Sequence, residues 1–116
     1  MGRPVVHFEI GCRDRAKTVS FYRELLGWEI QQDGPAAMVD TQSPTGIQGH
    51  ISALGHEPHN YVLVYAQVDD LDATVKEAER LGAKMMIPPT EVPGMGHFAW
   101  IHDPEGTLFG LWKPLS

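Results

Sequence analysis

A histidine and a glutamate two residues apart, His7 and Glu9, are the first residues whose chemistry suggests a site. On a strand they point to the same face. There the carboxylate raises the pKa of the imidazole, and the two groups form an acid–base pair. The alternative interpretation is a structural histidine, because many strands carry such a pair on a solvated face. Cys12 follows at a helix start, where a thiol pKa can fall, but no base is visible nearby and the sequence favours a buried small residue.

The residues around this pair alternate between polar and apolar over 4–10, which predicts a β-strand. Two helices are predicted at 13–26 and 69–81, each beginning near an aspartate and followed by a glycine. Runs of β-forming residues predict further strands at 28–30, 38–40, 47–53, 61–68, 84–87, 98–102 and 108–112. We expect a tight hairpin turn at 103–106, where proline and glycine occupy their preferred turn positions.

Residues 88–97 combine rigid prolines with flexible glycines. The proline pair at 88–89 is expected to end the preceding strand. The rest is interpreted either as a long connection pinned by proline or as a lid that carries Met95 and His97.

The order of predicted elements, βαβββ, occurs twice. Gly27 and Gly82 both follow a leucine, both precede a predicted strand, and lie 55 residues apart. The sequence therefore predicts a single domain over residues 1–116, built from modules at about 4–54 and 61–114 with a joint at 55–60. Each module is too small to bury a stable core alone, so we expect it to pack on the other module or on a second chain.

The composition excludes several classes of protein. With 42% hydrophobic and 21% charged residues, the chain is an ordinary globular one. Its net charge of −6 argues against a nucleic-acid partner. No apolar run is long enough to span a membrane, and no signal peptide is visible. With one cysteine, no disulfide forms within the chain. We expect a cytoplasmic protein.

Four motifs together resemble the vicinal oxygen chelate superfamily, which includes glyoxalase I, bleomycin-resistance proteins and extradiol dioxygenases. They are HFEI at 7–10, FYRELLGW at 21–28, VDDL at 68–71 and DPEG at 103–106. The resemblance covers nearly the whole chain. It implies an α+β fold in which two βαβββ modules form an incomplete barrel around a U-shaped cleft. It also implies that homodimers are common.

In metal-dependent members of that superfamily, the ligands lie on the first and last strands of each module. The resemblance places His7 at the first such position, and Gln48 or His50 on the last strand of the same module. The equivalent positions of the second module fall at Leu63 and Gly110, which cannot coordinate a metal ion. Since catalytic zinc needs three protein ligands, and non-haem iron needs two histidines and a carboxylate, we expect no tightly bound metal and no cofactor.

The leading hypothesis is therefore a protein that binds a small aromatic or amphipathic molecule in the cleft, as a homodimer. Tyr65 and Trp112 have the strand parity to line that cleft. We expect the ligand to contact four residues: His50, Tyr65, Trp112 and His97. If the chain is an enzyme, His7 and Glu9 are the expected catalytic residues. The alternative is a metal-dependent isomerase of the lactoylglutathione lyase type, or a dioxygenase, in which His7, Glu9 and His50 converge on a divalent metal.

Overall fold

The computed structural model describes residues 2–54 and 59–115. The chain divides into two compact units, a first unit of His7–Leu63 and a second unit of Val64–Ser116 together with Met1–Val6. The predicted joint at 55–60 lies mostly outside the described residues. Neither helix in the described part of the chain is long and apolar enough to cross a membrane.

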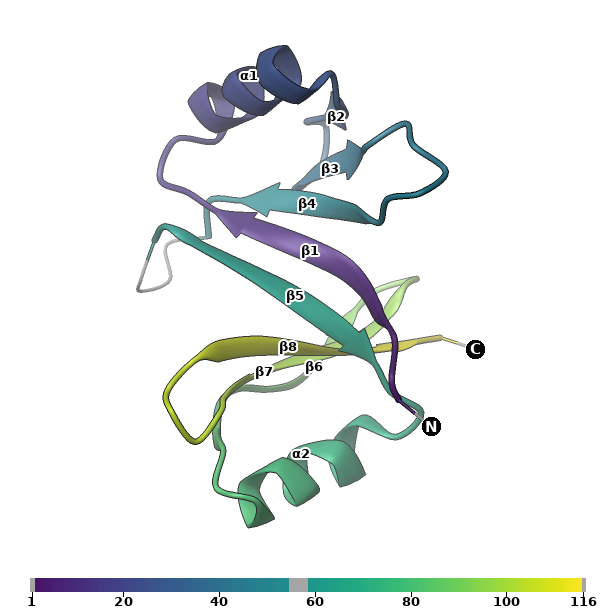
Figure 1. Cartoon of the computed structure of the whole chain (residues 1–116), viewed down its shortest axis with the longest axis vertical. Helices are drawn as coiled ribbons and strands as arrows, with labels where there is room; N and C mark the ends of the chain where they lie inside the picture. The colour runs from purple at the N-terminus through teal and green to yellow at the C-terminus, as the bar shows by residue number, and fades with distance from the viewer. Residues whose placement is uncertain (1, 55–58, 116) are drawn as a thin grey trace. The chain divides into compact units, whose positions relative to one another are not determined.

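The elements follow the predicted βαβββ order twice (Figure 1). The first set is β1 (Val5–Gly11), α1 (Arg15–Leu26), β2 (Glu29–Gln31), β3 (Ala37–Asp40) and β4 (Gln48–Ser52). The second set is β5 (Tyr61–Gln67), α2 (Leu71–Arg80), β6 (Lys84–Val92), β7 (Gly96–His102) and β8 (Leu108–Pro114).

The helix boundaries confirm the signals in the sequence. The Asp14 carboxylate accepts a hydrogen bond from the Lys17 backbone N–H at 3.0 Å, which caps the first turn of α1. Asp70 caps α2 in the same way. After α1 the chain turns through Gly27, whose φ of 70° lies in the left-handed region that favours glycine.

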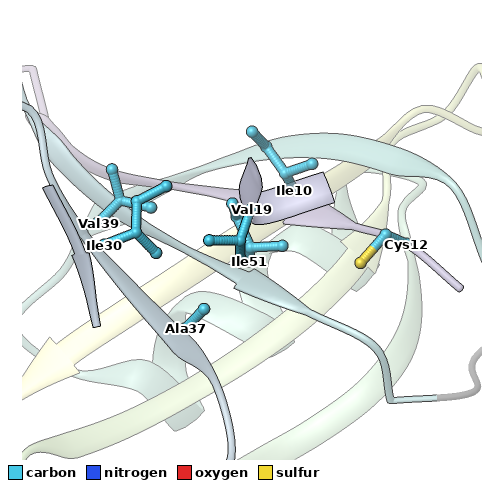
Figure 2. Packing of buried hydrophobic residues seen from close by; sticks show 7 residues of the cluster. All are labelled: Ile10, Cys12, Val19, Ile30, Ala37, Val39 and Ile51. Atoms are coloured by element: carbon cyan, nitrogen blue, oxygen red, sulfur yellow. The ribbon is translucent and has the colours of Figure 1, made fainter. Parts of the chain in front are cut away.

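In the first unit the strand order is β2-β3-β4-β1, with β1 and β4 parallel and the other pairs antiparallel. One face of this sheet packs against α1. Figure 2 shows the buried residues of this core: Ile10, Cys12, Val19, Ile30, Ala37, Val39 and Ile51. Leu25 and Leu26, which share helical spacing with Val19, are exposed. The inward stripe of α1 is therefore narrower than its sequence predicts.

The second unit has the order β5-β8-β7-β6, and α2 packs on it through a separate core. Its buried members are Val68, Leu71, Val75, Ala99, Ile101 and Leu111. The turn after β7 has the predicted form, because the Gly106 N–H donates to the Asp103 carbonyl at 2.8 Å.

The prediction that the two prolines end a strand is wrong. β6 runs through Pro88 and Pro89 to Val92, and its pairing with β7 shifts register between Ile87 and Thr90. β6 is an edge strand of the sheet. A proline whose missing N–H would point to the free edge therefore costs no hydrogen bond between strands. Residues 88–97 are therefore not a long irregular connection; they form the end of β6, the turn and the first two residues of β7.

Candidate functional site

The face of β1 and β4 that points away from α1 carries polar side chains. The two strands pair with Glu9 opposite His50. Ile10 and Ile51, the next residues along each strand, belong to the core under α1. Because successive side chains alternate between the faces of a strand, His7, Glu9 and His50 share the opposite face.

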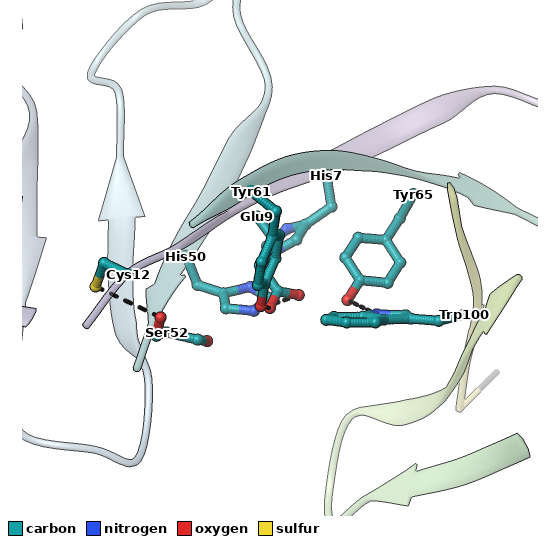
Figure 3. A network of polar contacts seen from close by, with 8 residues as sticks. All are labelled: His7, Glu9, Cys12, His50, Ser52, Tyr61, Tyr65 and Trp100. Carbon is teal, nitrogen blue, oxygen red and sulfur yellow. Dashed lines mark hydrogen bonds and ion pairs between the residues drawn. The ribbon is translucent and has the colours of Figure 1, made fainter. Parts of the chain in front are cut away.

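These three residues and Tyr61 at the start of β5 form one hydrogen-bonded chain, which we call the His7 network (Figure 3). His7 Nε2 lies 2.7 Å from His50 Nδ1. His50 Nε2 lies 3.0 Å from Glu9 Oε1. The Tyr61 hydroxyl donates to the other carboxylate oxygen, Glu9 Oε2. All four residues belong to the first unit.

The acceptor at the centre of the network fixes the direction of its hydrogen bonds. Glu9 is 2% exposed, and the Tyr61 hydroxyl donates to it. An ionised carboxylate only accepts, so in that state of Glu9 the His50 Nε2 also donates to it. In the tautomer that carries its proton on Nε2, His50 accepts at Nδ1 from His7 Nε2–H. The network can thus pass a proton between a carboxylate and the His7 ring through one imidazole.

Glu9 raises the pKa of His7, as predicted, but the net shift of this pKa is downward. The pKa of His7 is lowered from 6.5 to about 4, mainly by burial and also by the neighbouring His50, while Glu9 opposes both. Glu9 pairs with His50 Nε2, and its attraction for a charged His7 is weaker than the opposing effects of burial and His50 together. His7 is therefore neutral at pH 7, and its ring offers hydrogen bonds rather than a positive charge.

Tyr61 is a site residue that the sequence analysis missed. Burial raises the pKa of its hydroxyl, and the hydrogen bond to Glu9 raises it further, so Tyr61 stays a protonated donor. A Cβ at Gly11 would overlap the Tyr61 ring, so only glycine at that position lets the ring lie where it reaches Glu9. Tyr61 shares strand parity with Leu63 and Tyr65, and that spacing was the available signal.

Ser52, the last residue of β4, points to the same face of the strand as His50. Its side chain is 1% exposed, and its Oγ finds no hydrogen-bond partner among residues 2–54 and 59–115. Its carbonyl accepts from Cys12 Sγ at 3.5 Å. Cys12 is buried, as its sequence context indicates.

The network does not fit a metal site. His50 directs one ring nitrogen to His7 and the other to Glu9, so it cannot keep both contacts and also coordinate an ion. Across the described ranges, no group of three or more histidine, cysteine, aspartate or glutamate side chains could hold a metal ion.

Two other predicted contact residues, Tyr65 and Trp112, lie in the second unit. The indole N–H of Trp100 donates to the Tyr65 hydroxyl at 2.8 Å, as Figure 3 shows, and Tyr65 is 5% exposed. Gly110 stands opposite Tyr65 on β8, and Trp112 follows two residues later with a partly exposed side chain. The ligand-binding role of Tyr65 and Trp112 stays a prediction.

His97 lies within β7, opposite Glu91 on β6 and Lys113 on β8. It belongs to a paired strand. Its predicted contact with a ligand stays a prediction.

Comparison with known proteins decides the family. The family model of the Glyoxalase/Bleomycin resistance protein/Dioxygenase superfamily matches residues 5–111. The chain belongs to this superfamily. The resemblance of its four motifs and the α+β fold predicted from them are confirmed.

Two individual members of the superfamily show moderate sequence identity to this chain. The anthracycline biosynthesis protein DnrV of Streptomyces peucetius is 29% identical over 91% of the chain and 45% of its own length. The putative glyoxylase CFP32 of Mycobacterium bovis is 40% identical over 47% of the chain and 21% of its own length. The chain thus spans less than half the length of these two relatives.

Among solved structures, a methylmalonyl-CoA epimerase of Streptomyces coelicolor in complex with 2-nitronate-propionyl-CoA has a TM-score of 0.66. It is 21% identical, and the alignment covers 100% of this chain and 99% of the epimerase. This likeness shows the fold.

Proposed function

We propose that this chain binds a small aromatic or amphipathic molecule against the polar face of β1 and β4, without a tightly bound metal ion. The observation that supports this most directly is the closed bonding of the network. Both nitrogens of His50 and both oxygens of Glu9 are directed at protein partners. Such side chains hold one another in place and present His7 as a fixed, neutral hydrogen-bonding ring.

The relatives agree with a small-molecule ligand. The Streptomyces peucetius protein is named for anthracycline biosynthesis, and the Streptomyces coelicolor epimerase holds a coenzyme A derivative. Neither compound is assigned to this chain. We also propose, from their strand parity, that Tyr65 and Trp112 contact an aromatic ligand.

A second candidate function is a metal-dependent isomerase or dioxygenase. What favours it is that His7, Glu9 and His50 lie in one contiguous chain of contacts. If the hydrogen bonds of His50 rearranged, the three side chains would supply the two histidines and one carboxylate typical of a non-haem iron site. Metal content separates this function from the proposed one.

The test uses chain purified without a histidine tag. We expect elemental analysis to find far less than one equivalent of zinc, iron, nickel or manganese. Aromatic compounds that bind are identified by a tryptophan-fluorescence screen. We expect His7→Ala to lower their affinity by about two- to tenfold, which corresponds to the loss of one neutral hydrogen bond.

His102→Ala is the matched control, because His102 lies on β7 outside the network. It should leave those affinities unchanged. If the wild-type chain contains one equivalent of metal and His7→Ala contains none, the result would contradict the proposal and support the metal-dependent enzyme. Equal ligand affinities of wild type and His7→Ala would show that His7 does not contact the ligand.

We also propose that the protein is a cytoplasmic homodimer, as the resemblance implies. A second copy would bring the length of the assembly close to that of the Streptomyces peucetius relative, of which one chain spans 45%. Light scattering on the purified chain should give twice the 12.9 kDa of one chain. A monomer mass at all concentrations tested would contradict the dimer.

A further inference from the structure

A groove on the first unit lies apart from the three polar side chains of β1 and β4. Its volume is about 650 Å³, and it is lined by the end of β1, the first half of α1 and the start of β5. This volume is within the range of small-molecule sites, about 300–1,000 Å³. Of the His7 network, only Tyr61 lines the groove.

The groove offers apolar and aromatic surface to solvent. Phe21 on α1 is 56% exposed and Val62 on β5 is 70% exposed, although both are large apolar residues. Phe21 packs edge-to-face on Tyr22, with ring centroids 5.0 Å apart. This contact fixes the orientation of the Phe21 ring while leaving half of its surface open. Flat aromatic ligands bind to such rings with offset or edge-on geometry.

The charge of the groove is opposite to that of the chain. Arg13 and Lys17 line it, and neither side chain makes an ion pair within the described ranges. The one acidic lining residue, Asp14, already accepts the hydrogen bond that caps α1. In a chain of net charge −6, two cations in the same groove as the exposed Phe21 ring form a local positive site.

We propose that this groove binds a small anionic aromatic compound, a fused or substituted ring that carries a carboxylate or sulfonate. The ring lies against Phe21 and the apolar part of Tyr61, and the anion pairs with Arg13 and Lys17. This site goes beyond the proposed function, since it uses none of His7, Glu9 or His50.

The test compares two fluorescent probes with the same rings. 8-Anilino-1-naphthalenesulfonate carries the anion, and N-phenyl-1-naphthylamine lacks it. We expect the whole chain to bind one equivalent of the sulfonate, about tenfold more tightly than the amine, since each exposed ion pair contributes about threefold. The double variant Arg13→Gln/Lys17→Gln should abolish this preference and leave the affinity for the amine unchanged. Phe21→Ala should weaken both probes.

Three variants serve as controls. Lys76→Gln removes an exposed cation of α2 and should change nothing. His7→Ala should leave sulfonate binding intact, and a loss there would place the probe at the His7 network and overturn the groove. If Phe21→Ala lowers the midpoint of thermal unfolding, Phe21→Leu is used in its place. The leucine keeps most of the apolar volume and removes the ring.

Other outcomes would also overturn the proposal. Equal affinities of wild type for the two probes would show that charge has no role. An unchanged preference in Arg13→Gln/Lys17→Gln would place the anion elsewhere. Sulfonate affinity that falls as the protein concentration rises would show that a second copy of the chain, and not a small molecule, covers the groove.

Discussion

Replacement of Ile51 by alanine is expected to lower the free energy of unfolding by about 2–5 kcal/mol. Ile51 is 0% exposed, lies near the end of β4, and packs in the core that β4 shares with α1. Its removal costs the transfer of the lost methyl and methylene groups into water, and it leaves a cavity that neighbours such as Val19 cannot fill. No larger stability effect is expected from the other substitutions.

Urea unfolding followed by circular dichroism measures this loss. Ile47→Ala is the matched control, because Ile47 is 38% exposed and precedes the same strand. We expect the control to cost less than about 1 kcal/mol, as is usual for surface positions. Equal losses in the two variants would contradict the assignment of Ile51 to the core.

Stability is expected to fall between pH 6.5 and pH 4 because of His7. The pKa of His7 is lowered to about 4 in the native protein, whereas the unfolded chain keeps it near 6.5. The unfolded state therefore binds this proton first, and acid favours unfolding. The contribution of neutral His7 to the free energy of unfolding is fully present above pH 6.5. It is lost as the pH falls toward 4, and it does not change further below pH 4. Partial exposure of His7 screens the effect, so we expect a loss of about 1–2 kcal/mol.

The measurement is the free energy of unfolding at pH 7 and at pH 4 in wild type and His7→Gln. The glutamine keeps a donor toward His50 Nδ1 but does not titrate. The difference between the two curves isolates His7 from Glu9 and His50, the titratable groups that face it. His102→Gln should follow the wild-type curve. A His7→Gln curve as steep as wild type would show that the native protein does not suppress the charge on His7.

Local signals predicted most of the fold. Asp14, Gly27 and Asp70 act within one turn of the helices they bound, so they could be recognised from neighbouring residues alone. The alternation around His7 and Glu9 correctly separated the core face of β1 from its polar face. Both are properties of a few consecutive residues.

The site itself was only partly predictable, because its contacts join residues far apart in the sequence. Glu9 and Tyr61 are 52 positions apart, and Glu9 and His50 are 41 apart. Strand pairing decided that Glu9 lies opposite His50. The direction of the His7 pKa shift follows mainly from burial, which depends on the packing of the folded chain. Parity could have suggested Tyr61, but no local rule predicts its hydrogen bond to a buried carboxylate.

The prolines of β6 limit how this protein can assemble with other chains. An unpaired edge strand usually offers a ladder of N–H and C=O groups to which a neighbouring chain can add a strand, a common route to aggregation. Neither Pro88 nor Pro89 has an N–H to offer to an incoming strand, and the irregular register around them disturbs the straight edge that such a strand needs. A partner that approaches β6 therefore cannot extend its sheet over the full length of Lys84–Val92. Association with a second copy has to depend on side chains rather than on continuous backbone pairing along this edge.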